Sequence, residues 1–294
     1  MKRRAISVPA VALLLLSTSF LHAPVAAQKN KPSTPSPALL TRTTTRHDSR
    51  RLGYAGAVTI VGAPAGSITI EGWQRSEVEV SAELELRAPT AEDLDRLAVV
   101  NTFAIDEDAN HIRIITTGTH DKKFLKRVAK DFPKSLIGLP WKVDYQIKVP
   151  SMTDVSIDAG TGPIKMSGFE GSIRINAVES VADLSLTGSD LSVIIQKGAV
   201  NFTIPAHSWH GLRADIKLAT GSLAIALMPG FSADIDAEVL RTGEVKSAFP
   251  GLEPREQNSI GPHSLHGRAG NGGAMLTFTV GDGTIQIQPV SSKQ

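Results

Sequence analysis

From Leu52 onward, the chain is a succession of short segments in which apolar and polar residues alternate, separated by Gly, Pro, Asn or Asp. Alternation with a period of two is typical of β-strands that bury one face. The pattern therefore predicts strands at Val58–Val61, Ser67–Glu71, Glu77–Leu86, Phe103–Asp106, His111–Thr117, Val143–Val149, Val155–Asp158, Ile164–Ser167, Ser172–Asn176, Asp183–Thr187, Ser192–Gln196, Asn201–Ile204, Leu212–Lys217, Ser222–Leu227, Ala233–Ala237, Met275–Val280 and Thr284–Gln288.

A short unit, Gly-x-Ile/Leu-x-Ile/Met, recurs along the sequence. It begins at Gly66, Gly162, Gly171, Gly221 and Gly283. Glycine can supply a corner with positive φ, and the two aliphatic residues that follow can point inward and stack on the next turn of the chain. This repetition predicts an all-β, elongated, single-domain β-solenoid (β-helix-like). An antiparallel β-sandwich with the same strand spacing is the alternative.

Two segments have helical spacing instead. In Thr90–Val100 and in Asp121–Phe132 the apolar residues share one face, and in the second segment lysines and arginines crowd the other face. Pro133 should end the second helix, because its ring blocks further helical hydrogen bonding. We expect both to be short capping helices, the second inside a basic insertion that spans residues 118–141.

The N-terminal residues have the order of a secretory signal peptide. Lys2, Arg3 and Arg4 precede the apolar run Ile6–Leu16, and small residues lead up to Ala27. We expect residues 1–27 to be removed on export and no transmembrane segment to follow, because no later apolar run is long enough to span a bilayer. Residues 28–51, rich in Pro, Ser, Thr and basic side chains, are predicted to be a disordered linker.

Charge and composition narrow the function classes. Removing the signal peptide, with three basic and no acidic residues, takes the formal charge from +2 to −1. The linker then has a net charge of +5 and the rest of the mature chain a net charge of −6, so the domain is mildly acidic, with only 5% aromatic residues in the chain. Nucleic-acid binding is therefore excluded. The chain has no cysteine, so neither disulfides nor thiolate metal sites are expected.

Several passages resemble one known family. Gly66-Ser67-Ile68-Thr69-Ile70-Glu71-Gly72-Trp73, Tyr145-Gln146-Ile147-Lys148-Val149-Pro150, Gly160-Thr161-Gly162-Pro163-Ile164-Lys165-Met166 and Gly281-Asp282-Gly283-Thr284-Ile285-Gln286-Ile287 are similar to passages of the bacterial putative adhesin family of unknown function, which is known for its Gly-rich β-strand repeats. The resemblance spans about Leu52 to Pro289, within the predicted β-solenoid domain of residues 52–290. It implies an extended β-helical fold and a cell-envelope role, and it brings no catalytic residues with it.

The sequence offers two further constellations that could carry chemistry. The pairs His207/His210 and His263/His266 have a spacing that can chelate a metal on a helix, but they lie in loop-like contexts, so we expect solvated side chains and no metal or cofactor. A carbohydrate-active enzyme on a β-helix would need clustered carboxylates and a basic residue. The residues that could supply them are Asp154, Asp158, Asp183, Asp190, Lys165 and Arg174.

The basic helix is the feature that exceeds what the fold requires. It could dock on an anionic surface, lipid or glycan, or it could simply cap the open end of the β-structure. The cations concerned are Lys122, Lys123, Lys126, Arg127 and Lys130.

Together these patterns predict a non-catalytic, exported, adhesin-like binding module of the cell envelope, periplasmic or on the cell surface, that contacts glycan or protein through repetitive β faces. The alternatives are an envelope scaffold or sensor-associated protein, and the carbohydrate-active enzyme.

Overall fold

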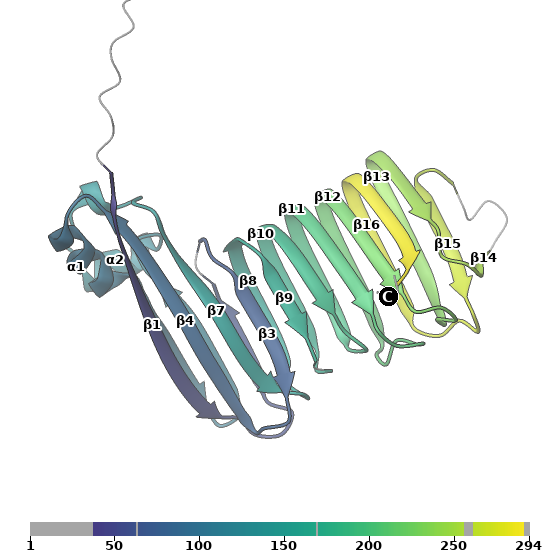
Figure 1. Ribbon diagram of the computed structural model, residues 1–294, viewed down its shortest axis with the longest axis horizontal. Coiled ribbons are helices and arrows are strands. Elements are labelled where there is room, and N and C mark those ends of the chain that lie inside the picture. Colours follow the sequence, from purple (N-terminus) through teal and green to yellow (C-terminus); the bar gives the residue numbers. More distant parts are fainter. Residues whose placement is uncertain (1–37, 63, 169, 256–260, 291–294) are drawn as a thin grey trace, which may run out of the picture. The chain divides into compact units, whose positions relative to one another are not determined.

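The computed structural model describes residues 38–62, 64–168, 170–255 and 261–290. The predicted signal peptide, and residues 28–37 of the predicted linker, lie outside these ranges. The described part is mostly β, with sixteen strands in one mixed sheet (Figure 1). The strands are β1 (Leu40–Arg51), β2 (Ala57–Val61), β3 (Ile68–Trp73), β4 (Glu77–Ala88), β5 (Thr102–Asp108), β6 (His111–Thr117), β7 (Trp141–Pro150), β8 (Asp154–Thr161), β9 (Ile164–Ser167), β10 (Ile173–Ser185), β11 (Asp190–Ile204), β12 (Arg213–Leu227), β13 (Ala233–Ser247), β14 (Leu252–Pro254), β15 (Ser264–Ala269) and β16 (Met275–Pro289).

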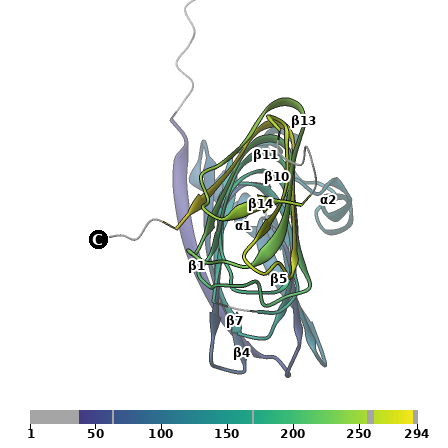
Figure 2. The same cartoon turned by 90° about the vertical axis from the view of Figure 1, so that its right-hand side faces the viewer.

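Long strands contribute to two half-sheets at once. The first half of β10 pairs with β8 and its second half pairs with β9, all parallel. We call the half-sheet made by β2, β5, β6, β8, β15 and the N-terminal halves of β10–β13 and β16 the N face. The half-sheet made by β1, β4, β7, β3, β9 and the C-terminal halves is the C face. Figure 2, a view along the stack of strands, shows successive long strands following one another around the same interior.

Glycines form the corner between the two faces. Gly198, Gly221, Gly243 and Gly283 have φ between 130 and 146°, a region that favours glycine. Gly221 pairs with Gly198 and with Gly283 in neighbouring strands, so the corners form a column. The predicted corner is confirmed at Gly66, Gly162, Gly221 and Gly283, which all have positive φ. It is wrong at Gly171, which has no positive φ and lies where a Cβ would meet the Thr153 carbonyl oxygen at 1.9 Å.

The core is a set of aliphatic columns between the two faces. Strands β10, β11, β12 and β16 pair in parallel and in register, so that Ile175, Val193, Ile216 and Phe278 lie one above another, each 0% exposed. Each such side chain stabilises the fold by about 1.5–3 kcal/mol relative to an exposed position. The outward residues between them are mostly polar, as the alternation predicts, and Ile194, 48% exposed, is an apolar exception.

The order of strands in space is not the order in the chain. β16 lies between β12 and β13 and pairs in parallel with both. On its other side β13 pairs antiparallel with β15. The chain therefore returns after β15 to place its last described strand between two strands that are consecutive in sequence.

Antiparallel pairing completes the sheet at the N-terminal end. β1 pairs antiparallel with β4 over its whole length, β4 pairs with β7, and β5 pairs with β6. The prediction of a disordered linker is therefore wrong for Leu40–Arg51. The sheet contains both the parallel pairing expected of a solenoid and the antiparallel pairing expected of a sandwich.

Helix α1 (Ala91–Val100) confirms the first predicted helix, with the Thr90 hydroxyl accepting from the Asp93 N–H at 3.1 Å. Helix α2 (Lys122–Val128) is shorter than predicted, and a 3₁₀ turn (Lys134–Leu136) follows Pro133. Leu94 and Leu97 of α1 pack with Leu136 in a small second core. Neither helix of the described residues is long and apolar enough to cross a membrane.

Candidate functional site

A polar depression crosses five neighbouring strands of the N face. We call it the face groove. It has a volume of about 330 Å³, and it is lined by Ala57, Val58, Thr59, Asp154, Val155, Ser156, Ser172, Ile173, Arg174, Asp190, Ser192 and Arg213. Its residues come from β2, β8, β10, β11 and β12 or directly precede them, because the same register position points outward in each strand.

A single row of side chains runs through the face groove. Register places Ser156 beside Thr59, and Arg174 between Ser156 and Ser192. The Thr59 Oγ1 lies 2.8 Å from His111 Nε2 at one end of the row. Arg174 is exposed, and no carboxylate in the described part of the chain lies within ion-pair distance of it. The row thus presents one unengaged guanidinium between hydroxyl groups.

Two carboxylates border this row. Asp154 Oδ1 accepts a hydrogen bond from the Ser172 N–H at 2.7 Å, and Asp190 Oδ1 accepts from Arg213 Nε at 2.9 Å. Both ends of the second pair are well exposed, so it contributes little to stability. Carboxylates, hydroxyls and a guanidinium on one open surface can together donate to and accept from the hydroxyl groups of a sugar polymer.

The structure divides the residues that an enzyme would need. Asp154, Asp190 and Arg174 lie together in the face groove. Asp183 and Lys165 are neighbours on the C face, where Asp183 accepts from Asn201 at 2.7 Å.

The sixth member of the enzyme set, Asp158, is on β8 of the N face and accepts from Asn176 at 2.9 Å. The six residues therefore do not form one cluster. Asp158 and Asp183 each hold a side-chain amide of the next strand.

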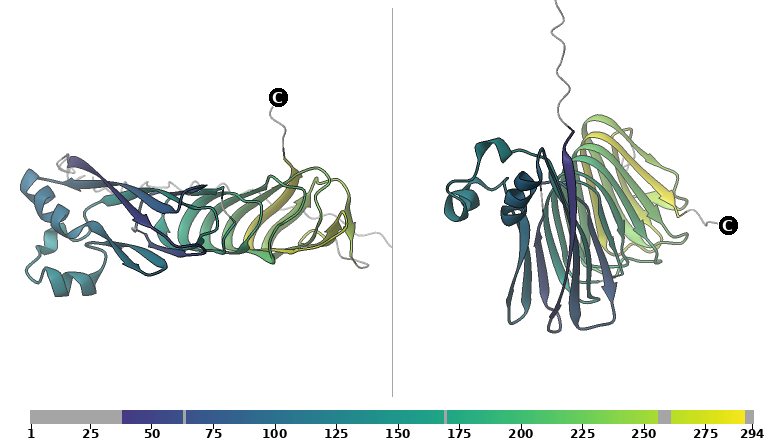
Figure 3. Two further views of the ribbon diagram at one scale, coloured as in Figure 1. Left: turned by 90° about the horizontal axis from the view of Figure 1, so that it is seen from below. Right: turned by 60° about the vertical axis from the view of Figure 1, so that its left-hand side comes forward.

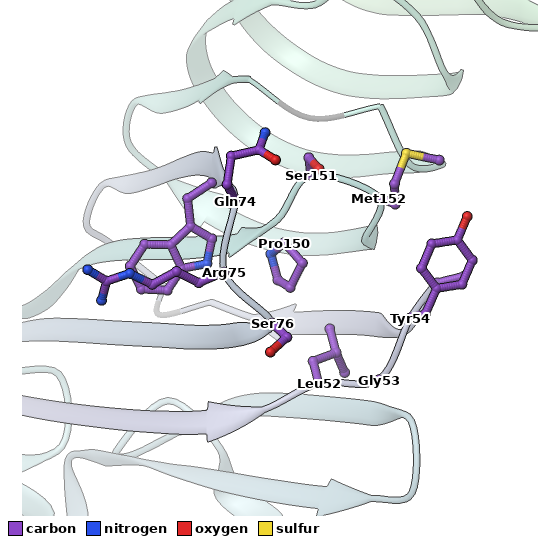
Figure 4. A pocket seen from close by; sticks show the side chains of 11 residues that line it. Leu52, Gly53, Tyr54, Gln74, Arg75, Ser76, Pro150, Ser151 and Met152 are labelled. Carbon is purple, nitrogen blue, oxygen red and sulfur yellow. The ribbon is translucent and has the colours of Figure 1, made fainter.

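A second hollow lies among three loops, and we call it the loop pocket (Figure 4). It has a volume of about 260 Å³ and is lined by Leu52, Gly53, Tyr54, Ala55, Trp73, Gln74, Arg75, Ser76, Pro150, Ser151 and Met152. Tyr54 is 85% exposed and Met152 is 45% exposed, while Trp73 Nε1 donates to the Glu77 carbonyl at 2.8 Å. The Arg75 guanidinium lies 4.9 Å from the centre of the Trp73 ring.

The loop pocket was not predicted from the sequence. Its signal is Tyr54, an aromatic residue inside the turn-forming run Gly53-Tyr54-Ala55-Gly56, where nothing in the fold requires a large side chain.

The five predicted basic residues are all exposed. Lys122, Lys123, Lys126 and Arg127 lie on α2, and Lys130 follows it. Asp121 caps the helix by accepting from the Lys123 and Phe124 N–H groups. The hydrogen bond from Phe124 holds the pKa of the Asp121 carboxyl below its usual value.

In each of the two predicted histidine pairs, one ring nitrogen lies close to an oxygen atom of another residue. His207 Nδ1 lies 3.0 Å from the Pro229 carbonyl oxygen, and His266 Nδ1 lies 3.0 Å from Asp236 Oδ1. Within the described ranges, no three His, Asp or Glu side chains gather in a way that could hold a metal ion.

The chain is thus a mostly β protein built on one mixed sheet. No model of a known protein family matches it, and no curated protein matches it. Its structure is similar to that of a putative cell adhesion protein from Clostridium sporogenes, with 12% identity and a TM-score of 0.43, over 84% of this chain and 100% of that one. It is also similar to a putative adhesin from Bacteroides fragilis, with 11% identity and a TM-score of 0.33, over 87% and 99% of the two chains.

Proposed function

We propose that this protein is an exported, non-catalytic, adhesin-like module that binds an envelope glycan along the N face of a β-solenoid. The parallel, in-register long strands and the column of corner glycines support the solenoid interpretation. The resemblance to the bacterial putative adhesin family supports the envelope role.

The observation that carries the proposal is the row Thr59, Ser156, Arg174 and Ser192 on a fully packed core. Because the backbone beneath the row is held by in-register neighbours on both sides, the positions from which its side chains project are fixed before a ligand arrives. Such preorganisation lowers the ordering cost of binding. A polymer laid across the strands meets a polar group at each strand, so many weak contacts add up.

The test is glycan binding by the purified protein on an array of envelope polysaccharides. Arg174→Gln should weaken binding by about tenfold, the loss expected for a charge-assisted hydrogen bond of about 1.5 kcal/mol. Lys165→Gln is the matched control, because Lys165 is an exposed cation without an ion-pair partner among the described residues, on the other face. Equal losses for both variants, or glycan binding by neither variant nor the parent, would contradict the proposal.

A test for polysaccharide degradation distinguishes the proposed binding module from a carbohydrate-active enzyme. We expect a bound polysaccharide to keep its mass during prolonged incubation. A falling mass that Asp190→Asn abolishes would replace the proposed function with the enzyme.

An envelope scaffold or sensor-associated protein is the second candidate, and the loop pocket favours it. Tyr, Trp and Arg are the residues that most often dominate protein–protein binding energy, and Tyr54, Trp73 and Arg75 line this one hollow. Tyr54→Ala should then remove a specific envelope protein from the set captured by the parent protein, while Arg174→Gln should not. Retention of every captured protein by Tyr54→Ala would count against the scaffold.

Export is part of the proposal and rests on residues 1–27. Mass spectrometry of the protein recovered from an envelope fraction should find Gln28 as the first residue. An intact Met1 would contradict export through a cleaved signal peptide.

A further inference from the structure

The segment from Lys122 to Lys134 contains a concentration of cations without ion-pair partners. Six lysines and arginines lie in it, and no described carboxylate is within ion-pair distance of any of them: Lys122, Lys123, Lys126, Arg127, Lys130 and Lys134. Among the other described lysines and arginines, only Arg51, Arg75, Lys165 and Arg174 lack such a partner.

Apolar side chains are exposed in this segment and directly after it. Val128 is 60% exposed and Ile137 is 42% exposed. Leu125 and Leu136 are buried, at 6% and 3% exposed, and so anchor the segment to the rest of the protein. The segment is therefore held in place while its cations and two aliphatic side chains face solvent. We call residues 120–137 the basic excursion.

The basic excursion replaces a tight corner of the kind that joins the two faces elsewhere in the sheet. β2 pairs with β6, and β3 pairs with β7. A corner at Gly66 joins β2 to β3, whereas the longer segment 118–140 joins β6 to β7. Figure 3 shows the teal helices standing off the strands to one side, away from the stacked long strands. The excursion can therefore meet a large flat surface without using the face groove.

We infer that the basic excursion docks this protein on an anionic phospholipid membrane. Each Lys or Arg close to such a surface strengthens partitioning by about fivefold. The exposed Val128 and Ile137 favour a membrane over an anionic polysaccharide, because aliphatic side chains gain from entering the boundary between headgroups and acyl chains and have no comparable environment in a sugar polymer. This inference goes beyond the proposed function and does not depend on glycan binding.

The test is co-sedimentation of the purified protein with phosphatidylcholine vesicles, with and without phosphatidylglycerol. We expect binding only to the anionic vesicles, weakened by salt because the attraction is screened. The triple variant Lys122→Gln, Lys123→Gln and Lys126→Gln should partition about a hundredfold less. The matched control removes three lysines elsewhere, by Lys165→Gln, Lys197→Gln and Lys217→Gln. We expect its partitioning onto the anionic vesicles to stay within about twofold of that of the parent.

A second variant separates membrane docking from general polyanion binding. Val128→Ser with Ile137→Ser keeps every cation and should still lower vesicle binding by several-fold. Binding of the parent to a soluble anionic polysaccharide but not to the anionic vesicles would overturn the inference. So would equal losses in the two lysine triple variants, or unchanged binding in Val128→Ser with Ile137→Ser. Arg174→Gln should leave vesicle binding unchanged, so this experiment and the glycan test fail separately.

Discussion

At the residue scale, the corner glycines are where the backbone leaves no room for another side chain. A Cβ on Gly221 would lie 1.8 Å from the carbonyl oxygen of Gly198, and φ at Gly221 is 143°. Two separate costs therefore apply to any substitution, the strained φ and the clash with a neighbouring backbone. Gly230 has a φ of 77° but nothing within 4 Å of its ideal Cβ position, so it bears the first cost alone.

We predict that Gly221→Ala lowers the free energy of unfolding by at least twice as much as Gly230→Ala, which should lose about 1 kcal/mol. Denaturant unfolding of the two variants beside the parent measures both losses. Similar losses would mean that the strands separate easily and that the column of corners is not tightly packed.

Tyr145 makes the stability depend on pH at the alkaline end. It is 0% exposed, its hydroxyl lies 2.8 Å from the Thr116 hydroxyl, and burial raises its pKa to about 12. The folded protein therefore keeps this phenol protonated at a pH where the unfolded chain ionises it. The resulting stability is fully present below the unfolded pKa of 10.0 and is lost as the pH rises through 12.

Between those two pH values we expect ionisation of Tyr145 in the unfolded chain to lower the free energy of unfolding by about 1.4 kcal/mol per pH unit. Tyr145→Phe should be less stable at neutral pH, because it leaves the buried Thr116 hydroxyl unpaired, yet it should lose less stability than the parent on going to high pH. The other tyrosine, Tyr54, is 85% exposed, so Tyr54→Phe is the control and should follow the parent curve. Parallel curves for the parent and Tyr145→Phe would contradict the assignment.

At the element scale, the alternation of polar and apolar residues predicted most strands but not their lengths. Ser172–Asn176 and Asp183–Thr187 were predicted as two strands, and they overlap the two ends of the single strand β10 (Ile173–Ser185). The corner between them has no proline and no loop-forming run, because a long strand can bend there without breaking its pairing with β11. Sequence spacing could not tell a bend from a break.

β1 could not be predicted from burial because it buries almost nothing. All its side chains are exposed or half-buried. The strand is held by backbone pairing along β4 and by charge contacts such as Arg46 over the Phe103 ring at 4.5 Å. A prediction based on the positions of apolar residues therefore assigns Leu40–Arg51 to a linker. The face groove could not be predicted as a unit either, because it is assembled from β2, β8, β10, β11 and β12, whose pairing follows from the fold.

β16 gives a prediction of its own, because its position completes two ladders. A chain that ends at Ala274 leaves β12 and β13 without the strand between them. We expect hydrogen exchange in β13 and β15 to become fast while β8 and β10 stay protected. A chain that ends at Val290 is the control. Unchanged protection of β13 in the shorter chain would show that β12 and β13 can pair directly through the short connection 228–232.

At the scale of the whole described unit, each strand pairs only with its neighbours in the sheet, and packing across the core adds contacts such as Phe202 with Phe278, whose ring centroids lie 6.3 Å apart. The free energy of unfolding of such an arrangement is approximately the sum of the contributions of its repeating strands and of the interfaces between neighbouring strands. We predict the slowest hydrogen exchange in β10, β11 and β12, which have parallel partners on both sides, and faster exchange in β1 and β14 at the two ends. Uniform protection across all strands would indicate a single cooperative unit instead.

The identical pairing of β11 on β10 and of β12 on β11 also makes the protein extensible. Each strand presents to the next a core column and an outward row in the register that it receives, with Ser180, Gly198 and Gly221 at the successive corners. Duplicating residues 190–212 would therefore insert one more strand, about 4.8 Å of spacer, without altering either terminus of the array. Reach becomes a property that gene duplication, or a protein engineer, can adjust in uniform increments.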